Sequence, residues 1–351
     1  MSSEDERREF HEWLGKPAVT FGDASVDVAD LVLLGLALGW WAIFEERVER
    51  GLVLQSLELD PIAPDEVRLA ATEFRYQRGL VSASEFTAWL SARSLRVVDL
   101  SGFLIRLLLR GREEGRTVEA RPDMSGVLWA EAVCHGLLLQ LARAASDRLA
   151  AAHRVGEPDL SEGDLESVSA IVEQALDSSA TGLPRLGEAA LRSRVTRLQG
   201  LEASLQRLRE QVADRSALDR CLRSHKLDWL QINGEEIILD TEGAAREARM
   251  LVVADSLPLS EAAERARAQI RVRRIVLDKA PGEASTALVA AAPGELAGPW
   301  LERQRWRLIR VTSKVPPSVE EPETRERAVE ELTRDVLDRT LAGRVEWPQP
   351  L

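Results

Sequence analysis

Histidine and cysteine, the side chains that most often serve as nucleophiles, general bases or metal ligands, are rare in this sequence. The 351 residues include four histidines and two cysteines: His11, His135, His153, His225, Cys134 and Cys221. Cys134 and His135 are neighbours, but adjacent helical positions point about 100° apart, so joint metal binding is not expected. The sequence has no Gly-rich phosphate loop, His-Glu-x-x-His, nucleophile elbow or Cys-x-x-Cys. We therefore expect no metal, no cofactor and two buried free thiols.

Charged and aromatic side chains gather instead late in the chain. Glu235 and Glu236 lie in "DWLQINGEEIILDT", and arginines alternate with apolar residues in "IRVRRIVLD" and "RWRLIRVT". This alternation predicts strands with one basic face. Two readings stay open: the basic face pairs with the protein's own carboxylates, or it holds an acidic peptide.

The predicted peptide-contact residues are Glu236, Ile238, Trp300, Trp306, Arg305 and Arg307. Tryptophan is common at binding surfaces because it offers a large apolar area with one polar atom. The alternative for the two tryptophans is a place in the core, and for Glu236 it is an ion pair with a strand arginine. Tryptophans in apolar helical patterns, such as Trp40 and Trp41, are expected to be core residues.

The elements that must position these residues follow the order β-α-α-β-α-β-β between residues 229 and 315. An Asn-Gly pair at positions 233 and 234 predicts a hairpin turn near the start of this region. The Pro-rich run "KVPPSVEEPETR" then predicts a linker, and "RERAVEELTRDVLDRTLAG" predicts a last amphipathic helix.

The rest of the chain predicts helices. Ser82 with Glu85 forms a capping-box pattern that starts one of them. One long helix is expected from about residue 28 to residue 59. Leucines at helical spacing between Leu198 and Leu208 predict a helix that packs on its neighbours, with a homodimer contact as the alternative.

Composition excludes several classes of protein. A formal net charge of −12 does not favour nucleic-acid binding. The first residues, "MSSEDERREFHEW", have no hydrophobic core of a signal peptide. The apolar run "VADLVLLGLALGWWAIF" contains Asp30 and is shorter than the roughly 20 residues of a membrane span, so a buried core helix is expected. These features predict a cytoplasmic protein with no membrane partner.

Several motifs, in this order, resemble SurA-like proteins, which join a helical chaperone domain to parvulin-type prolyl isomerase domains. "EERVERGLVLQSLELDPIAPDEVRLAATEFRYQRGL" resembles the long helix, break and second helix of the chaperone domain. "EEIILDTEGAAREA", "SEAAERARA" and "PGELAGPW…RWRLIRV" resemble successive parts of a parvulin domain. The layout and the ending "GRVEW" are similar to peptide maturation system proteins, which are tied to ribosomally made natural-product peptides.

The sequence departs from active parvulins at the catalytic positions. Where that family carries a histidine on the first and the last strand, this sequence has Glu236 and Arg307. The usual Gly-Gly-Asp-Leu-Gly run is missing, and no histidine or cysteine lies within the parvulin-like region. The resemblance therefore implies a scaffold that binds peptides and has lost isomerase activity.

Together these features predict a mainly α fold with a small α+β domain. The expected parts are a SurA-like helical domain (1–120), an additional helical domain (121–228), a shortened parvulin-like domain (229–315), and a linker with a C-terminal helix that returns to the helical domain (316–351). By resemblance, the protein would be a chaperone-like or accessory protein that binds a ribosomal precursor peptide and works beside peptide-modifying enzymes. The alternatives are an active prolyl isomerase and a peptide-modifying enzyme with its site in the middle helical block.

Overall fold

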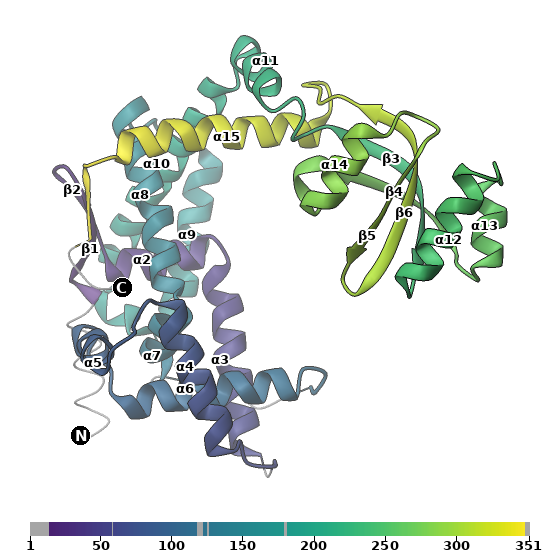
Figure 1. Ribbon diagram of the computed structural model, residues 1–351. Coiled ribbons are helices and arrows are strands. Elements are labelled where there is room, and N and C mark those ends of the chain that lie inside the picture. Colours follow the sequence, from purple (N-terminus) through teal and green to yellow (C-terminus); the bar gives the residue numbers. More distant parts are fainter. Residues whose placement is uncertain (1–13, 58, 118–121, 125, 179–180, 348–351) are drawn as a thin grey trace. The chain divides into compact units, whose positions relative to one another are not determined.

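The computed structural model describes residues 14–57, 59–117, 122–124, 126–178 and 181–347 (Figure 1). The chain is mainly α-helical with a small α+β region, as the sequence predicts. The first thirteen residues, which include His11 and underlie the prediction that no signal peptide is present, lie outside the described residues.

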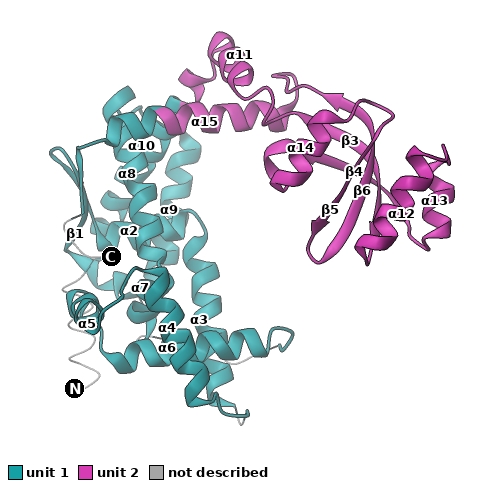
Figure 2. Cartoon of the chain, viewed as in Figure 1, with its two compact units in different colours: residues 1–208, 336–351 teal, residues 209–335 magenta. Residues whose placement is uncertain are grey.

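The chain divides into two compact units (Figure 2). Unit 1 consists of Met1–Leu208 and Val336–Leu351, and unit 2 of Arg209–Asp335. The predicted segment 1–120 and most of 121–228 fall in unit 1, and the whole segment 229–315 falls in unit 2. Residues 336–351 return to unit 1, so unit 2 is inserted into unit 1 in sequence terms.

Unit 1 contains a helical bundle and a small sheet. Its helices are α2 (Val28–Ala37), α3 (Trp40–Ser56), α4 (Pro64–Gln77), α5 (Ala83–Ala92), α6 (Val97–Arg112), α7 (Leu128–His135), α8 (Leu137–Val155), α9 (Glu162–Asp177), the 3-10 helix η2 (Leu183–Leu186) and most of α10 (Glu188–Val212). The sheet has the order β2 (Ala24–Asp27), β1 (Pro17–Phe21), β7 (Val345–Glu346). The capping box of Ser82 and Glu85 at the start of α5 is present as predicted.

The prediction of a single helix from residue 28 to residue 59 is wrong. This segment forms two helices, α2 and α3, whose axes differ by 95°. The break lies at Gly39, which adopts a left-handed conformation with φ of 71°. No single helix in the described ranges is long and apolar enough to cross a membrane, although this bent pair meets the length and composition criteria together. Nine of the ten α2 residues are buried, but Trp40 at the start of α3 is 39% exposed, so the expectation that Trp40 is a core residue is also wrong.

Buried ion pairs connect the helices of unit 1. The Asp30 carboxylate in α2 is 1% exposed and accepts hydrogen bonds from Arg194 (2.8 Å) and Arg197 of α10. Burial raises the pKa of Asp30, as does the negative charge of Asp27. The buried Glu131 of α7 accepts from Arg106 of α6 at 2.6 Å. Each pair fixes one helix against another, because an unpaired charge at the same depth would be costly.

Unit 2 contains the predicted α+β region and the helices beside it. Its elements are α11 (Arg215–Ser224), β3 (Gln231–Leu239), α12 (Glu242–Val253), α13 (Leu259–Arg265), β4 (Ile270–Val276), the 3-10 helix η3 (Leu277–Lys279), α14 (Gly282–Ala290), β5 (Leu296–Glu302), β6 (Arg305–Val315) and most of α15 (Pro322–Leu341). The predicted order β-α-α-β-α-β-β between residues 229 and 315 is confirmed.

The four long strands form one antiparallel sheet with the order β4-β3-β6-β5. Helix α14 packs on one face, where Leu288 joins Ile232 and Ile309 in a buried cluster. Helices α12 and α13 pack on the other face, where Ala248 joins Ile237 and Leu308 in a second cluster (Figure 1). Because successive strand residues point to opposite faces, the neighbours Leu308 and Ile309 serve different cores.

The prediction of a hairpin turn at the Asn-Gly pair, Asn233 and Gly234, is wrong. Strand β3 runs straight through Asn233 and Gly234 and pairs with both β4 and β6. A Cβ atom on Gly234 would lie 2.5 Å from Ile309 Cγ2 and 2.7 Å from the Arg310 carbonyl oxygen. Glycine is required here because the neighbouring strand approaches closely at a bulge, not because the chain reverses.

Candidate functional site

The α14 face of the sheet carries a cluster of four charged side chains. Glu236 of β3 pairs with Arg307 of β6 at 2.8 Å and with Arg273 of β4. Glu302 of β5 pairs with Arg307 at 3.1 Å and with Arg273 at 3.2 Å. Each strand contributes one member, and the two carboxylates balance the two guanidinium groups.

The electrostatics of this cluster favour the charged form of Glu302. Glu236 is only 3% exposed, and two arginines, Arg273 and Arg307, contact its carboxyl group. Burial raises the pKa of Glu302, but the hydrogen bond and charge of Arg273 and the charge of Arg307 outweigh burial and hold that pKa below its usual value. The structure thus places an ion-paired network at the two positions where the parvulin resemblance expects histidines.

The cluster lacks a group suited to proton transfer near neutral pH. Of the described histidines, His135 and His153 belong to unit 1, and His225 follows α11. Burial raises the pKa of the Cys134 thiol to about 12 and also raises the pKa of the Cys221 thiol, so neither sulfur is an activated nucleophile. Within the described ranges, no group of three or more His, Cys, Asp or Glu side chains is arranged to hold a metal ion.

The two tryptophans of the predicted site are not brought together. Trp300 is 2% exposed and packs in the core beneath α14, so its ring is not offered to a peptide in this structure. Trp306 is half-buried and packs against the cluster formed with α12 and α13, on the opposite face. They are separated because Trp300 lies opposite Arg307 in the strand register, whereas Trp306 lies opposite Leu301.

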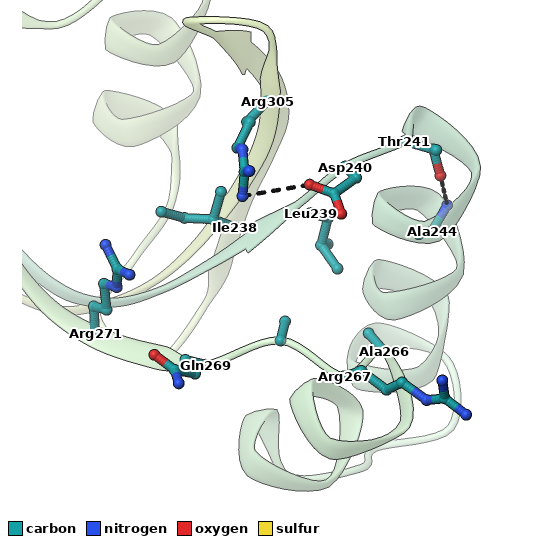
Figure 3. A pocket seen from close by; sticks show the side chains of 11 residues that line it. Ile238, Leu239, Asp240, Thr241, Ala244, Ala266, Arg267, Gln269, Arg271 and Arg305 are labelled. Atoms are coloured by element: carbon teal, nitrogen blue, oxygen red, sulfur yellow. Dashed lines mark hydrogen bonds and ion pairs between the residues drawn. The ribbon is translucent and has the colours of Figure 1, made fainter.

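A pocket of about 550 Å³ opens where β3 ends and β4 and β6 begin (Figure 3). Ile238 lies in its wall with Arg305 and Arg271 from the two neighbouring strands, and Asp240 lies at 3.4 Å from Arg305. Thr241 caps α12 by accepting from the Ala244 amide, which fixes the helical side of the pocket. The pocket thus combines apolar side chains, among them Ile238 and Leu239, with cationic groups on the strands.

Some of these pocket residues escaped the sequence prediction. Ile238 and Arg305 were predicted, but Asp240, Thr241 and Arg267 were not. The sequence did carry a local signal for this wall, since Thr241 directly follows a strand and precedes an Ala-rich helix, which is the pattern of an N-cap. No local pattern indicates that the residues after α13 return to the same pocket.

Strand β4 forms a free edge of the sheet beside this pocket. It pairs with β3 on one side, and it stands at the end of the strand order. Its apolar side chains are exposed, with Val272 at 89% and Ile270 at 38%. Four of the predicted peptide-contact residues, Trp300, Arg305, Trp306 and Arg307, lie on β5 and β6. Strand β6 lies between β3 and β5, so of those two strands only β5 is at an edge.

Unit 1 has a second, smaller cavity of about 260 Å³. It lies between one face of α3 and the junction of α7 with α8, and it exposes Trp40 and Ile43 beside Arg47 and His135. Its volume suits a single side chain rather than a larger ligand.

The fold and site define a mainly helical protein with a small sheet domain that carries a basic pocket. No protein-family model matches the chain, and no curated protein matches it. Among solved structures it is similar to the foldase protein PrsA from Lactococcus lactis, with 13% identity over 66% of this chain and 93% of that chain and a TM-score of 0.28.

Two further solved structures are similar to the chain. One is PrsA from Streptococcus pneumoniae, with 12% identity over 65% of this chain and 87% of that chain and a TM-score of 0.26. The other is a SurA-like chaperone from Campylobacter jejuni, with 9% identity over 62% of this chain and 89% of that chain and a TM-score of 0.21. These neighbours are foldase and SurA-like chaperones.

Proposed function

We propose that this protein is a chaperone-like or accessory protein that binds an extended peptide at the β4 edge and the adjoining pocket, without prolyl isomerase activity. The observation that carries the proposal is the free edge of β4, with Val272 exposed beside the pocket around Ile238. An unpaired strand edge supplies backbone donors and acceptors to an added strand, and neighbouring pockets then select its side chains.

The charged cluster supports binding rather than isomerisation. Rotation about a prolyl bond is promoted by a shaped pocket that twists the amide, since the barrier of about 20 kcal/mol is rotational. Here the corresponding face is filled by the interlocked Glu236, Arg273, Glu302 and Arg307 side chains. Opening the pocket at that position would break ion pairs that lie largely out of solvent.

The similarity of the sequence to peptide maturation system proteins suggests the partner in this proposal. The bound peptide is the precursor of a ribosomally made natural product, and the protein presents it, in the cytoplasm, to the enzymes that modify it. Neither a cofactor nor a metal is needed for this role.

The experiment measures binding of a fluorescently labelled precursor peptide, encoded beside the gene, to the full chain by anisotropy. Val272→Ser is expected to weaken binding roughly 10-fold, because an exposed valine that becomes buried under a ligand contributes on that scale. The matched control is Leu301→Ser, since Leu301 is an exposed apolar residue on the other edge strand, β5. Absence of binding, or equal losses in the two variants, would reject the proposal.

The isomerase alternative is tested separately with a proline-containing tetrapeptide. The rate of cis–trans conversion is measured against protein concentration, and we expect no increase above the uncatalysed rate. A rate that rises linearly with protein would show that the ion-paired cluster does not prevent catalysis. The mass of the precursor after incubation with the protein tests the third reading, and an altered mass would favour a modifying enzyme.

A further inference from the structure

Strand β4 presents two chemically different rows at its free edge. Arg271 lies opposite Glu236 in the strand register, on the α14 face of the sheet. Val272 lies opposite Glu235 and Ile270 lies opposite Ile237, on the other face. Because side chains alternate along a strand, a segment added to this edge would meet a guanidinium on one face and apolar groups on the other.

The arginines of this edge differ in how they are balanced. Arg273 is neutralised by Glu236 and Glu302, and Arg274 is paired with Glu321 and, at 3.6 Å, with Glu323. These two arginines therefore have carboxylate partners of their own.

Arg271 is different, because it is exposed and makes no ion pair within the described parts of the chain. It lines the pocket together with Arg267 and Arg305, against the single carboxylate of Asp240 (Figure 3). A pocket with excess positive charge in a chain of net charge −12 favours a ligand that brings carboxylates.

A second copy of this chain is a poor occupant of the same edge. Pairing β4 with another β4 would set the run from Arg271 to Arg274 against its own copy, and like charges on adjacent strands destabilise the pair. A nucleic-acid strand would satisfy Arg271 but would leave Ile270 and Val272 without apolar partners. An acidic peptide strand satisfies both rows.

We propose that the β4 edge is selective for an extended peptide segment in which acidic and apolar residues alternate. The acidic side chains lie beside Arg271 and the pocket, and the apolar side chains cover Ile270 and Val272 on the opposite face. This inference rests on the proposed peptide-binding function and names the ligand class of the same site.

The test compares labelled synthetic peptides of about eight residues, a usual strand length, bound to the full chain. The first alternates Glu with Val, the second alternates Gln with Val, and the third has the Glu/Val composition in two blocks. The alternating Glu/Val peptide is expected to bind roughly 10-fold more tightly than either of the others. The Gln/Val peptide loses the charge-assisted contact with Arg271. The block peptide cannot place its acidic and its apolar side chains on opposite faces of the strand.

Two variants locate the effect. Arg271→Gln is expected to weaken binding of the alternating Glu/Val peptide roughly 10-fold and to leave the Gln/Val peptide within about 2-fold. The control is Arg325→Gln, an exposed arginine on α15 that removes the same formal charge from unit 2. Thermal unfolding of both variants confirms that neither has lost its fold.

The outcomes separate the two proposals. If the Gln/Val peptide binds as tightly as Glu/Val and both depend on Val272, the edge binds peptides but the acidic selectivity is rejected. Equal binding of the block peptide rejects the alternating register. If a single-stranded oligonucleotide of the same length binds as tightly as Glu/Val, the site recognises polyanions and the peptide class is rejected. If no peptide binds, including the precursor, the proposed function itself fails.

Discussion

At the scale of single residues, Glu236 and Arg307 contact each other, and each contacts one further side chain of opposite charge. Glu236 is 3% exposed and contacts two arginines, and Arg307 contacts two glutamates. Removing one member leaves two opposite charges with one partner each in a poorly solvated place, which costs more than an exposed pair contributes. The cluster is thus a structural unit whose members cannot be exchanged singly.

Glu236→Gln is expected to lower the free energy of unfolding of unit 2 by about 3 kcal/mol, because Arg273 and Arg307 then lack one of their carboxylates. Denaturant unfolding of the full chain measures the loss. Combining it with Arg307→Met is expected to cost less than the sum of the single changes, with a coupling energy of about 1–3 kcal/mol. Additive losses would show that the two side chains act independently.

Acid is expected to weaken the same cluster through Glu302. The pKa of Glu302 is lower in the folded chain than its usual value of 4.5, so its contribution to stability is complete above that pH and is lost as the pH falls through the folded-state pKa. We expect the wild type to lose more stability than Glu302→Gln when the pH is lowered from about 6 to about 3. Parallel pH profiles for the two proteins would contradict the assignment.

At the scale of elements, glycines decide where helices stop and where strands approach. Gly39 and Gly136 adopt left-handed conformations, with φ of 71° and 78°, and each separates two helices that the apolar pattern alone would join. An isolated glycine in a helical pattern costs only about 1 kcal/mol, so the pattern itself does not reveal a break. Packing of the flanking helices selects the bent conformation.

Gly234→Ala tests the close approach of β3 and β6. The added Cβ atom would meet Ile309 Cγ2 at 2.5 Å and the Arg310 carbonyl oxygen at 2.7 Å. Because a backbone atom cannot move away without disturbing the sheet, we expect a loss of about 2 kcal/mol in thermal or denaturant unfolding. The control is Gly243→Ala in the first turn of α12, where a Cβ meets nothing within 4 Å and stability is expected to be unchanged or higher.

At the scale of the whole molecule, the two ends of unit 1 come from distant parts of the sequence. The chain leaves unit 1 after Leu208 and returns at Val336, and β7 then pairs with β1. The register joins Val345 to Phe21 and Glu346 to Thr20. Unit 1 is therefore complete only when the C-terminal strand is present.

Deletion of residues 345–351 is expected to lower the melting temperature of unit 1 by a few degrees, because β1 loses one of its two partner strands. The matched control deletes residues 348–351 alone and keeps β7. Differential scanning calorimetry measures both. Equal melting temperatures for the two shortened chains would show that β7 contributes nothing measurable to unit 1.

Local sequence signals predict part of the fold, but they predict little of the candidate site. The capping boxes of Ser82 and Ser161 involve residues three positions apart, so the sequence locates those helix starts directly. Trp300 and Trp306 show the limit. They are six positions apart, yet the β5–β6 hairpin puts them on opposite faces of one sheet.

The sequence by itself determined the mainly helical composition, the order of strands and helices in residues 229–315, and the absence of histidine and cysteine from that region. These depend on residue types and on contacts a few positions apart. Only the tertiary structure decided that β4 is a free edge and that Glu236 pairs with Arg273 and Arg307, which lie 37 and 71 positions away. Strand order and register arise from long-range packing, and no local pattern encodes which strands lie at the edges of the sheet.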